Sequence, residues 1–188
     1  MQIDDIRTNH ETDSSVWKGV VAGLAGGLVA SLAMSQFQTL WSKAGEALTE
    51  RKGQSGQDSQ NQQKSESKQD QEDPTMKAAE KMAKPVLGRH LTKEEKKSAG
   101  PIIHYAFGAL MGGTYGLAGE LAPITRSLFG LPYGAALFVA ADEVAVPALG
   151  LSKPPSQTPA SSHLYGLASH LVYAATLETV RRNVRRIL

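Results

Sequence analysis

The hydrophobic residues of this chain gather in long runs separated by polar segments. The first run extends from Val16 to Trp41 and carries one charge, Lys18, near its start. At about 1.5 Å of rise per residue it exceeds the roughly 30 Å hydrocarbon core of a bilayer. The two tryptophans of the chain, Trp17 and Trp41, bracket this run, as is typical of rings that lie at the two membrane interfaces. The pattern predicts a transmembrane helix over residues 16–42.

Three further apolar runs follow in the second half of the chain. They extend from Ile102 to Ala122, from Ser127 to Leu151 and from Ser162 to about Val180, and prolines punctuate them. Backbone polar groups in lipid must be satisfied internally, and nothing here alternates like a barrel strand. We therefore predict an all-α integral membrane bundle of four transmembrane helices. Residues 101–188 would hold helices two to four and a basic C-terminal end.

The remaining segments are polar. Residues 1–15 are acidic and lack the positive start of a secretory signal, so they predict a polar tail before a retained anchor. Residues 43–73 are rich in Gln, Ser, Lys and acids without apolar periodicity, which predicts a disordered linker. Residues 74–100 predict two short amphipathic helices on the membrane surface. Thr92 and Glu95 resemble a capping box that opens the second of them, and Gly100-Pro101 is expected to close it.

Composition narrows the function classes. The sequence has no cysteine, which excludes disulfides, thiolate metal sites and cysteine nucleophiles. A net charge of +2, without interleaved aromatic and basic residues, predicts no nucleic-acid partner. Neither a Gly-x-Ser-x-Gly elbow nor a phosphate-binding loop is present. We therefore expect a protein that is not an enzyme and needs no cofactor.

Glycines recur at four-residue spacing in two of the predicted spans. Small residues on one stripe allow helix backbones to approach closely in lipid, where apolar burial supplies no driving force. The pattern predicts helix-packing faces, within one chain or between chains. The first face is in helix one and the second in helix two: Gly19, Gly23 and Gly27, then Gly108, Gly112 and Gly116.

Ionisable residues lie inside the predicted spans. A charge at mid-membrane costs at least about 2.5 kcal/mol on the insertion scale, so such groups normally face the bundle interior and pair. Up-and-down threading of the helices predicts two polar layers. One is a buried cluster of His104, Asp142, Glu143, His163 and His170, in which His104 and His163 share a depth. The other contains Glu120 and Glu178, which Arg181 or Arg126 would neutralise.

Three interpretations of the buried cluster remain open. It could be a hydrogen-bond network that fixes helix register, a proton or cation path, or a metal or haem site between helices. His163 and His170 are seven residues apart and therefore share a helix face. Pro147 removes the helical bond to the Glu143 carbonyl. The result is either a kink beside two carboxylates or an ordinary helix end.

These same residues resemble a known family. The motifs are His104-Tyr105-x-Phe107-Gly108, Tyr115-Gly116 with Glu120, Asp142-Glu143-x-x-x-Pro147, His163-Leu164-x-Gly166 and His170-Leu171-x-Tyr173. In them the chain is similar to the YagU-like domain of unknown function, from helix one onward except the linker. The resemblance implies a small multi-helix protein of a bacterial inner membrane, with no established activity.

The function expected from these features is that of a non-enzymatic, multi-pass membrane protein. It would act as a homo-oligomer or as an accessory subunit of a larger membrane complex, with the lipid bilayer and other membrane subunits as partners. The alternatives are a proton or cation conductor and a redox subunit that binds haem or a metal. The arginines near the C-terminus favour cytoplasmic termini over a cytoplasmic long loop.

Overall fold

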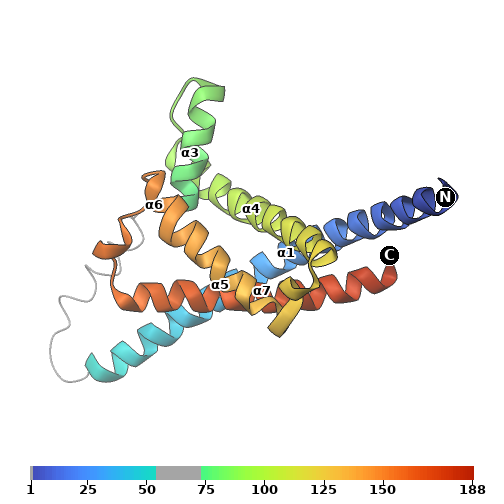
Figure 1. Cartoon of the computed structure of the whole chain (residues 1–188). Coiled ribbons are helices and arrows are strands. Elements are labelled where there is room, and N and C mark those ends of the chain that lie inside the picture. The colour runs from blue at the N-terminus through green and yellow to red at the C-terminus, as the bar shows by residue number, and fades with distance from the viewer. Residues whose placement is uncertain (1, 54–72) are drawn as a thin grey trace. The chain divides into compact units, whose positions relative to one another are not determined.

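The regular secondary structure of the described residues is helical. The computed structural model describes residues 2–53 and 73–188, with side chains described in 15–48, 73–85 and 87–188 (Figure 1). Within these ranges there are α-helices, short 3₁₀ and π segments, and no strand. The predicted all-α class is therefore confirmed for this part of the chain. Most of the predicted linker, residues 54–72, lies outside the described residues.

Helix α1, Gln2–Gly53, is longer than the sequence pattern predicts at both ends. The predicted polar tail and the first residues of the predicted linker both belong to it. The chain contains no proline before Pro74, and residues 43–51 are mostly good helix formers such as Lys, Ala, Glu and Leu. Hydrophobic periodicity identifies only the part of the helix that has something to pack against. The predicted boundaries at residues 15 and 43 are therefore wrong as helix ends.

The described chain divides into two compact units. Unit 1 contains residues 1–34 and 104–188, and unit 2 contains residues 35–103. Helices α1 and α4, Lys93–Leu121, each contribute to both units. The site discussed below belongs to unit 1.

Glycine stripes join α1 to α4 within unit 1. A Cβ atom added at Gly19, Gly23 or Gly27 would overlap the carbonyl oxygen of Gly116, Gly112 or Gly108, respectively. The reversed order shows that the two helices are antiparallel. The two stripes that the sequence pattern singled out thus face each other within one chain, at a separation that no side chain would permit.

Helix α7, Ala160–Ile187, runs parallel to α4 and lies beside α5, Leu131–Phe138 (Figure 1). The Tyr173 hydroxyl donates to the Gly108 carbonyl at 2.6 Å, and Arg185 Nε donates to Glu120 Oε1 at 3.1 Å. Both bonds join residues 65 positions apart, which fixes the parallel register. A Cβ at Gly134 of α5 would meet the His170 backbone, and one at Gly166 would meet Phe138. Helix α5 therefore runs opposite to α7, as up-and-down threading predicts.

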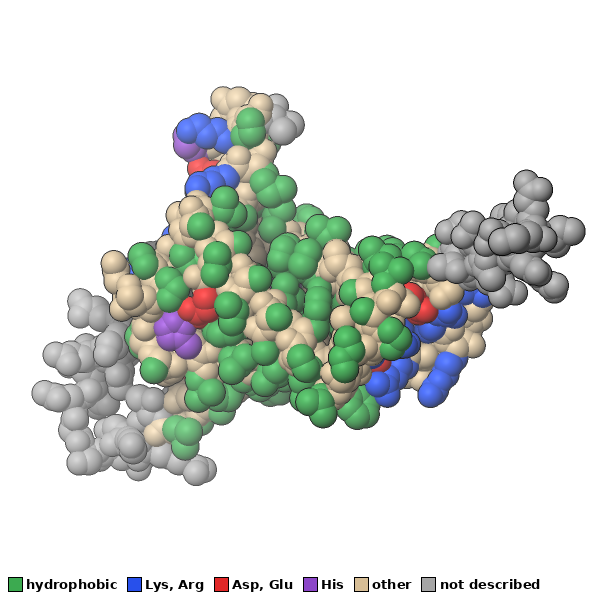
Figure 2. Space-filling model, viewed as in Figure 1, with side chains coloured by type: hydrophobic (Ala, Val, Ile, Leu, Met, Phe, Trp, Pro, Cys, Tyr) green, Lys and Arg blue, Asp and Glu red, His purple; other side chains and the backbone are tan. Residues whose placement is uncertain are grey.

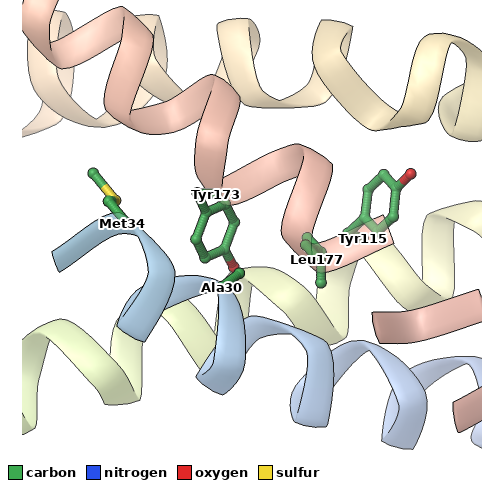
Figure 3. Packing of buried hydrophobic residues seen from close by; sticks show 5 residues of the cluster. All are labelled: Ala30, Met34, Tyr115, Tyr173 and Leu177. Carbon is green, nitrogen blue, oxygen red and sulfur yellow. The ribbon is translucent and has the colours of Figure 1, made fainter. Parts of the chain in front are cut away.

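The apolar core of unit 1 lies between α1, α4 and α7. Figure 3 shows its buried members, Ala30, Met34, Tyr115, Tyr173 and Leu177. Tyr133 and Leu137 of α5 pack against them. Tyr133 also donates a hydrogen bond to the Met111 carbonyl at 2.7 Å. Small residues and tyrosines thus occupy positions that larger aliphatic residues fill in most water-soluble cores.

The third predicted span is interrupted. Residues 123–130 form η1, Pro123–Gly130, in which Leu128 and Phe129 have φ angles of 48° and 55°. Helix α5 begins at Leu131, after the predicted start of this span at Ser127, but the stretch that is long and apolar enough to cross a membrane already begins at Pro123. The π segment η2, Val139–Ala145, and the short helix α6, Val146–Ala148, continue it to the turn at Gly150. A 3₁₀ turn, η3, Pro155–Gln157, precedes α7.

Unit 2 contains helix α3, Pro74–Leu87, and the first turns of α4. The predicted capping box is confirmed, because the Thr92 N–H donates to Glu95 Oε2 at 2.8 Å and the Glu95 N–H to Thr92 Oγ1 at 3.3 Å. The predicted helix end at Gly100-Pro101 is wrong, since α4 continues through both residues. A Cβ at Gly100 would lie 3.1 Å from Met76 Cγ. This glycine therefore provides room for α3 and does not terminate α4.

Two segments of the described chain are long and apolar enough to cross a membrane. They are Ser15–Leu48 and Pro123–Ala148. The second and fourth predicted spans, in α4 and α7, are not among them. Both helices carry charges: α4 has Lys and Glu before Gly100 and Glu120 near its other end, and α7 has Glu178 and the arginines after Val180.

Candidate functional site

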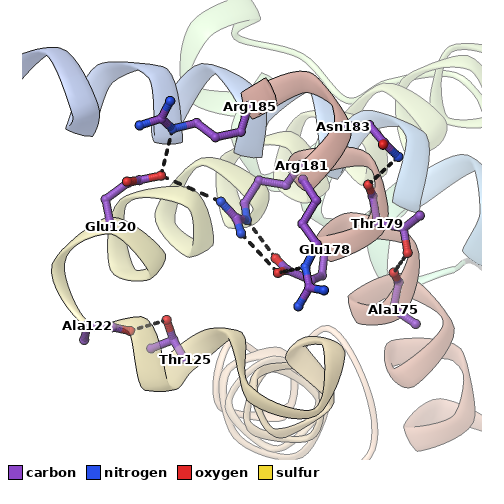
Figure 4. Close-up of polar contacts among 10 residues, drawn as sticks. Glu120, Ala122, Thr125, Ala175, Glu178, Thr179, Arg181, Asn183 and Arg185 are labelled. Atoms are coloured by element: carbon purple, nitrogen blue, oxygen red, sulfur yellow. Dashed lines mark hydrogen bonds and ion pairs between the residues drawn. The ribbon is translucent and has the colours of Figure 1, made fainter. Parts of the chain in front are cut away.

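An acid and arginine layer closes one end of unit 1. We use the name arginine layer for Glu120 of α4 together with Glu178, Arg181, Arg182 and Arg185 of α7 (Figure 4). Glu178 accepts from Arg181 Nε at 2.7 Å and Nη2 at 3.0 Å, and from Arg182 Nε at 2.6 Å. Glu120 accepts from Arg185 Nε at 3.1 Å and lies 3.7 Å from Arg181 Nη1. Arg181 thus bridges the two carboxylates.

The centre of this layer is buried. The side chains of Glu178 and Arg181 are 0% and 2% exposed. Arg181 also lies over the Tyr115 ring, with 5.9 Å between its Cζ atom and the ring centroid. The two-point pairing of a guanidinium with a carboxylate is the geometry that best compensates the removal of both charges from water.

The sequence pattern named Glu120, Glu178 and Arg181 for this layer, and the structure brings these three residues together. It adds Arg182 and Arg185 as partners. The spacing of Glu178 to Arg182, four residues along a helix, is a signal that sequence reasoning could have used. The pairing of Arg185 with Glu120 could not be predicted, because it depends on the register between α4 and α7, which the sequence does not show. Ser15 Oγ of α1 also donates to Glu120 Oε2, at 3.0 Å.

A second layer pairs carboxylates with histidines. We use the name histidine layer for Asp142 and Glu143 of η2 and His163 and His170 of α7. Glu143 Oε1 lies 2.6 Å from His163 Nδ1, and Asp142 Oδ2 lies 3.7 Å from His170 Nδ1. Two adjacent acids therefore face two histidines that are seven residues apart.

The π segment η2 gives this layer its form. A π turn accommodates an extra residue within a helix, and such turns are frequent at functional sites. The turn ends just before Pro147, which has no N–H to offer the carbonyl four residues back. Gly166 of α7 contributes as well, because a Cβ there would lie 3.4 Å from Asp142 Oδ2. The widened turn and the missing side chain together allow η2 to lie close to α7.

His163 and His170 also bind backbone oxygens. His170 Nδ1 donates to the Gly166 carbonyl at 2.9 Å. His163 Nε2 lies 3.2 Å from the Pro155 carbonyl oxygen and 3.3 Å from that of Thr158. The His163 ring thus connects η2 to the loop that precedes α7.

His104 is not joined to the histidine layer by a hydrogen bond or ion pair among the described residues. Its Nε2 atom is buried and has no hydrogen-bond partner there. The offset of 65 positions between α4 and α7 pairs His104 with Ser169. His104 therefore lies deeper in the bundle than His163. The prediction that His104 and His163 share a depth disagrees with this register.

The two layers are separated by the core. Along α7, Tyr173 and Leu177 lie between His170 and Glu178, and their side chains are 2% and 0% exposed. Tyr115 and Ala30, both 0% exposed, come from the neighbouring helices. In the part of the chain with described side chains, no three or more His, Asp or Glu side chains gather as they would around a metal ion.

The exterior of unit 1 is apolar. Leu24, Leu28, Leu32 and Val29 of α1 are between 38% and 48% exposed, and Val139 and Val144 of η2 are 52% and 58% exposed. Figure 2 shows apolar side chains across the middle of the visible face, with Lys and Arg gathered beside the C-terminal part of α7. The smaller apolar residues Ala22, Ala30, Ala141 and Ala174 are buried.

Unit 2 carries ion pairs on its surface. Arg89 donates two hydrogen bonds to Glu95, at 2.7 and 2.8 Å, and Lys96 and His90 both pair with Glu80. The Arg89 guanidinium, aided by the Thr92 N–H, lowers the pKa of Glu95 from an ordinary 4.5 to about 2. Lys96 and then His90 lower the pKa of Glu80. These pairs stabilise the α3–α4 connection while leaving its surface charged.

The architecture defines a class: an all-α protein with two helices long and apolar enough to span a membrane, and with two polar layers in one unit. The arginine layer is buried at its centre, whereas the histidine layer, predicted to be buried, is partly exposed, with the Asp142 side chain 42% exposed. The chain belongs to the family described as protein of unknown function (DUF1440), which matches residues 64–179. This match begins within the segment predicted as linker and leaves out the first apolar run, in contrast to the coverage expected from the resemblance. The comparison with curated proteins and the comparison with solved structures each found no match.

Proposed function

We propose that this chain is a non-enzymatic, multi-pass membrane protein in which α1, α4, the α5–α6 segment and α7 cross the bilayer as a four-helix bundle. Its place would be a bacterial inner membrane, where it acts as a homo-oligomer or as an accessory subunit of a larger complex. Besides the two candidate spans, the proposal adds α4 and α7 as transmembrane helices, because they pack directly against those spans.

The observation that carries the proposal is the distribution of side chains by size. The glycines of the two stripes meet backbone inside unit 1, and Ala22, Ala30, Ala141 and Ala174 are buried, whereas Leu24, Leu28, Val29, Leu32, Val139 and Val144 are exposed. In water this arrangement would expose most of the apolar area that could stabilise a fold. In lipid it is favourable, because helices associate through close backbone packing and large apolar side chains contact acyl chains.

The arginine layer supports the same environment. A helix in lipid can carry buried acids only if they are paired inside the protein. Glu178, Arg181 and Glu120 satisfy that condition in full. Because α4 and α7 supply this pairing to each other, both helices can enter a bilayer although each has a polar end.

The histidine layer is proposed to fix register. It holds η2 and the loop before α7 against α7, and the Tyr173 and Leu177 side chains separate it from the arginine layer. Between the two layers the polar side-chain atoms named above are the Tyr173 and Tyr115 hydroxyls, and the Tyr173 hydroxyl already donates to the Gly108 carbonyl. A path for protons or cations would have to use these hydroxyls. We therefore favour the structural role of the histidine layer and keep conduction of protons or cations as the competing function.

The test uses the full chain, expressed in bacterial cells. We expect it to stay in the membrane pellet after an alkaline carbonate wash and, after extraction in mild detergent, to migrate on a native gel as an oligomer or with other membrane proteins. Release by carbonate would contradict the bundle, and a stable lone monomer would contradict the subunit role. pH-dependent flux in proteoliposomes that falls in His170→Ala, compared with empty vesicles, would favour conduction instead.

A further inference from the structure

Among the described side chains of unit 1, one end has an excess of positive charge. The arginine layer pairs three guanidinium groups, from Arg181, Arg182 and Arg185, with two carboxylates. Arg126 and Arg186 lie in the adjoining segments, and neither forms an ion pair with a side chain of residues 15–48, 73–85 or 87–188. The Arg126 side chain passes Gly119, where an added Cβ would lie 3.2 Å from its Cγ and Cδ atoms. Among the described side chains, the carboxylates that pair with arginines of this group are Glu120 and Glu178.

The other end of unit 1 has the opposite character. The histidine layer contains Asp142 and Glu143, and the loop between α6 and α7 has one basic residue, Lys153. The charge of the described side chains is therefore unevenly distributed along the bundle, with arginines at the end where α4 gives way to η1 and where α7 finishes.

Exposed apolar side chains lie beside these arginines. Ile124, Leu128 and Phe129 of η1 are 77%, 73% and 57% exposed, and Leu121 at the end of α4 is 65% exposed. Arg182 lies over the Phe129 ring, with its Cζ atom 4.8 Å from the centroid. This combination of exposed apolar side chains and guanidinium groups is typical of segments that lie at the level of lipid headgroups.

The backbone of η1 is strained in a way that presents these side chains. Leu128, Phe129 and Gly130 have φ angles of 48°, 55° and 74°. Left-handed backbone costs about 1–2 kcal/mol at each non-glycine residue. In water this segment would also expose two large apolar side chains. A lipid environment removes the second cost, because Leu128 and Phe129 can then enter the apolar edge of the bilayer.

From these observations we propose that the end of unit 1 formed by η1 and the last turns of α7 is a binding surface for anionic phospholipid, with Leu128 and Phe129 in the acyl region and Arg126, Arg182 and Arg186 at the headgroup phosphates. The inference rests on the proposed membrane bundle. Each juxtamembrane arginine near an anionic surface is worth about 1 kcal/mol. Three of them suffice to distinguish anionic from zwitterionic lipid by tenfold or more.

Residues 4–13 are acidic, so the experiment must separate them from lipid as the counter-charge for these arginines. They include Asp4, Asp5, Glu11 and Asp13 against one basic residue, Arg7, and they precede Ser15, which binds Glu120. Lipid is the occupant favoured by the exposed apolar side chains of η1, because an acidic helix would leave them in water. The experiment below separates the two.

The test measures thermal unfolding of the full chain in neutral detergent micelles doped with phosphatidylglycerol or phosphatidylcholine. We expect phosphatidylglycerol to raise the midpoint by several degrees, with an apparent affinity at least tenfold above that for phosphatidylcholine. The preference should fall below threefold in Arg126→Gln/Arg186→Gln. It should remain in Lys153→Gln, which changes a basic residue at the other end. Leu128→Ser/Phe129→Ser should weaken the affinity for both lipids.

Three results would overturn the proposal. One is the absence of a phosphatidylglycerol preference in the wild-type chain. This includes the case in which a preference appears only after Asp4, Asp5, Glu11 and Asp13 are changed to their amides, because the acidic segment would then be the partner of the arginines. Another is an equal effect of inorganic phosphate without lipid. The third is an unchanged preference in the double arginine variant. Carbonate resistance of each variant is measured in parallel, so that failure of lipid selectivity is distinguished from failure of membrane insertion.

Discussion

At Gly23 and Gly112 the backbones of α1 and α4 approach so closely that a Cβ on either residue would overlap the other helix. Only hydrogen fits at these positions, whatever the chemistry of a larger side chain. At Glu178 the constraint is charge: its carboxylate, 0% exposed, is held by two arginines. Residue-scale tests can therefore separate the contribution of space from that of charge.

Gly112→Ala should destabilise the protein by about 1–3 kcal/mol, since the new methyl group must push α1 and α4 apart. Gly45→Ala is the matched control, because a Cβ at Gly45 meets nothing within 4 Å. It should be neutral or stabilise α1 by about 0.5–1 kcal/mol. Denaturant unfolding in mixed micelles, followed by circular dichroism, measures both. Equal stability of the two variants would contradict the close packing.

Glu178→Ala should destabilise the protein by about 3–5 kcal/mol, because it leaves the buried Arg181 guanidinium without its nearest carboxylate. The double variant Glu178→Leu/Arg181→Leu should recover much of this loss, since no unpaired charge then remains buried. Lys153→Ala, at an exposed basic residue outside the arginine layer and outside the proposed lipid surface, should change stability by no more than about 0.5 kcal/mol. The same unfolding experiment applies, and a loss in the double variant equal to that in Glu178→Ala would argue against the ion pair.

At the scale of elements, local sequence signals predict some helix ends correctly and others incorrectly. The capping box at Thr92 and Glu95 has the predicted form, because both partners are close in sequence. Gly100-Pro101 does not end α4, because Gly100 is required by a contact with α3 that the local sequence does not reveal. The local sequence does not predict the π segment η2 either. Its turn depends on Gly166 of another helix as well as on Pro147.

The α3–α4 connection should respond to acid. Glu95 is stabilised in its charged form by Arg89, which lowers its pKa from 4.5 to about 2. A carboxyl group with a depressed pKa stabilises the fold above its unfolded pKa and loses that contribution as pH falls through the folded one. We therefore expect the contribution to be complete above pH 4.5 and to be lost between pH 4.5 and about 2.

The measurement is the carboxyl carbon shift of Glu95 in a labelled sample, followed by nuclear magnetic resonance against pH. The midpoint should lie near 2 in the wild-type chain and rise toward 4.5 in Arg89→Ala. Arg89→Lys should give an intermediate value, because a lysine can form one hydrogen bond to the carboxylate where arginine forms two. A wild-type midpoint near 4.5 would show that the pair does not form.

At the scale of the whole molecule, the sequence supports the helical class and the direction of the helices in unit 1. It identified Glu120, Glu178 and Arg181 as neighbours, and Asp142, Glu143, His163 and His170 as another group. It could not show the exact partners, because these depend on the register between α4 and α7. His104 illustrates the limit: the same register places it level with Ser169, away from the depth expected for it.

The parallel register of α4 and α7 has a consequence for how this family can vary in length. Two hydrogen bonds, at Gly108–Tyr173 and at Glu120–Arg185, span the same offset of 65 positions. One residue added between these points in either helix would turn everything beyond it by about 100°. Insertions and deletions are therefore tolerable only in pairs, or in connecting segments such as residues 149–159. The paired parts of α4 and α7 must therefore keep the same length as each other, while the connecting segments can vary in length.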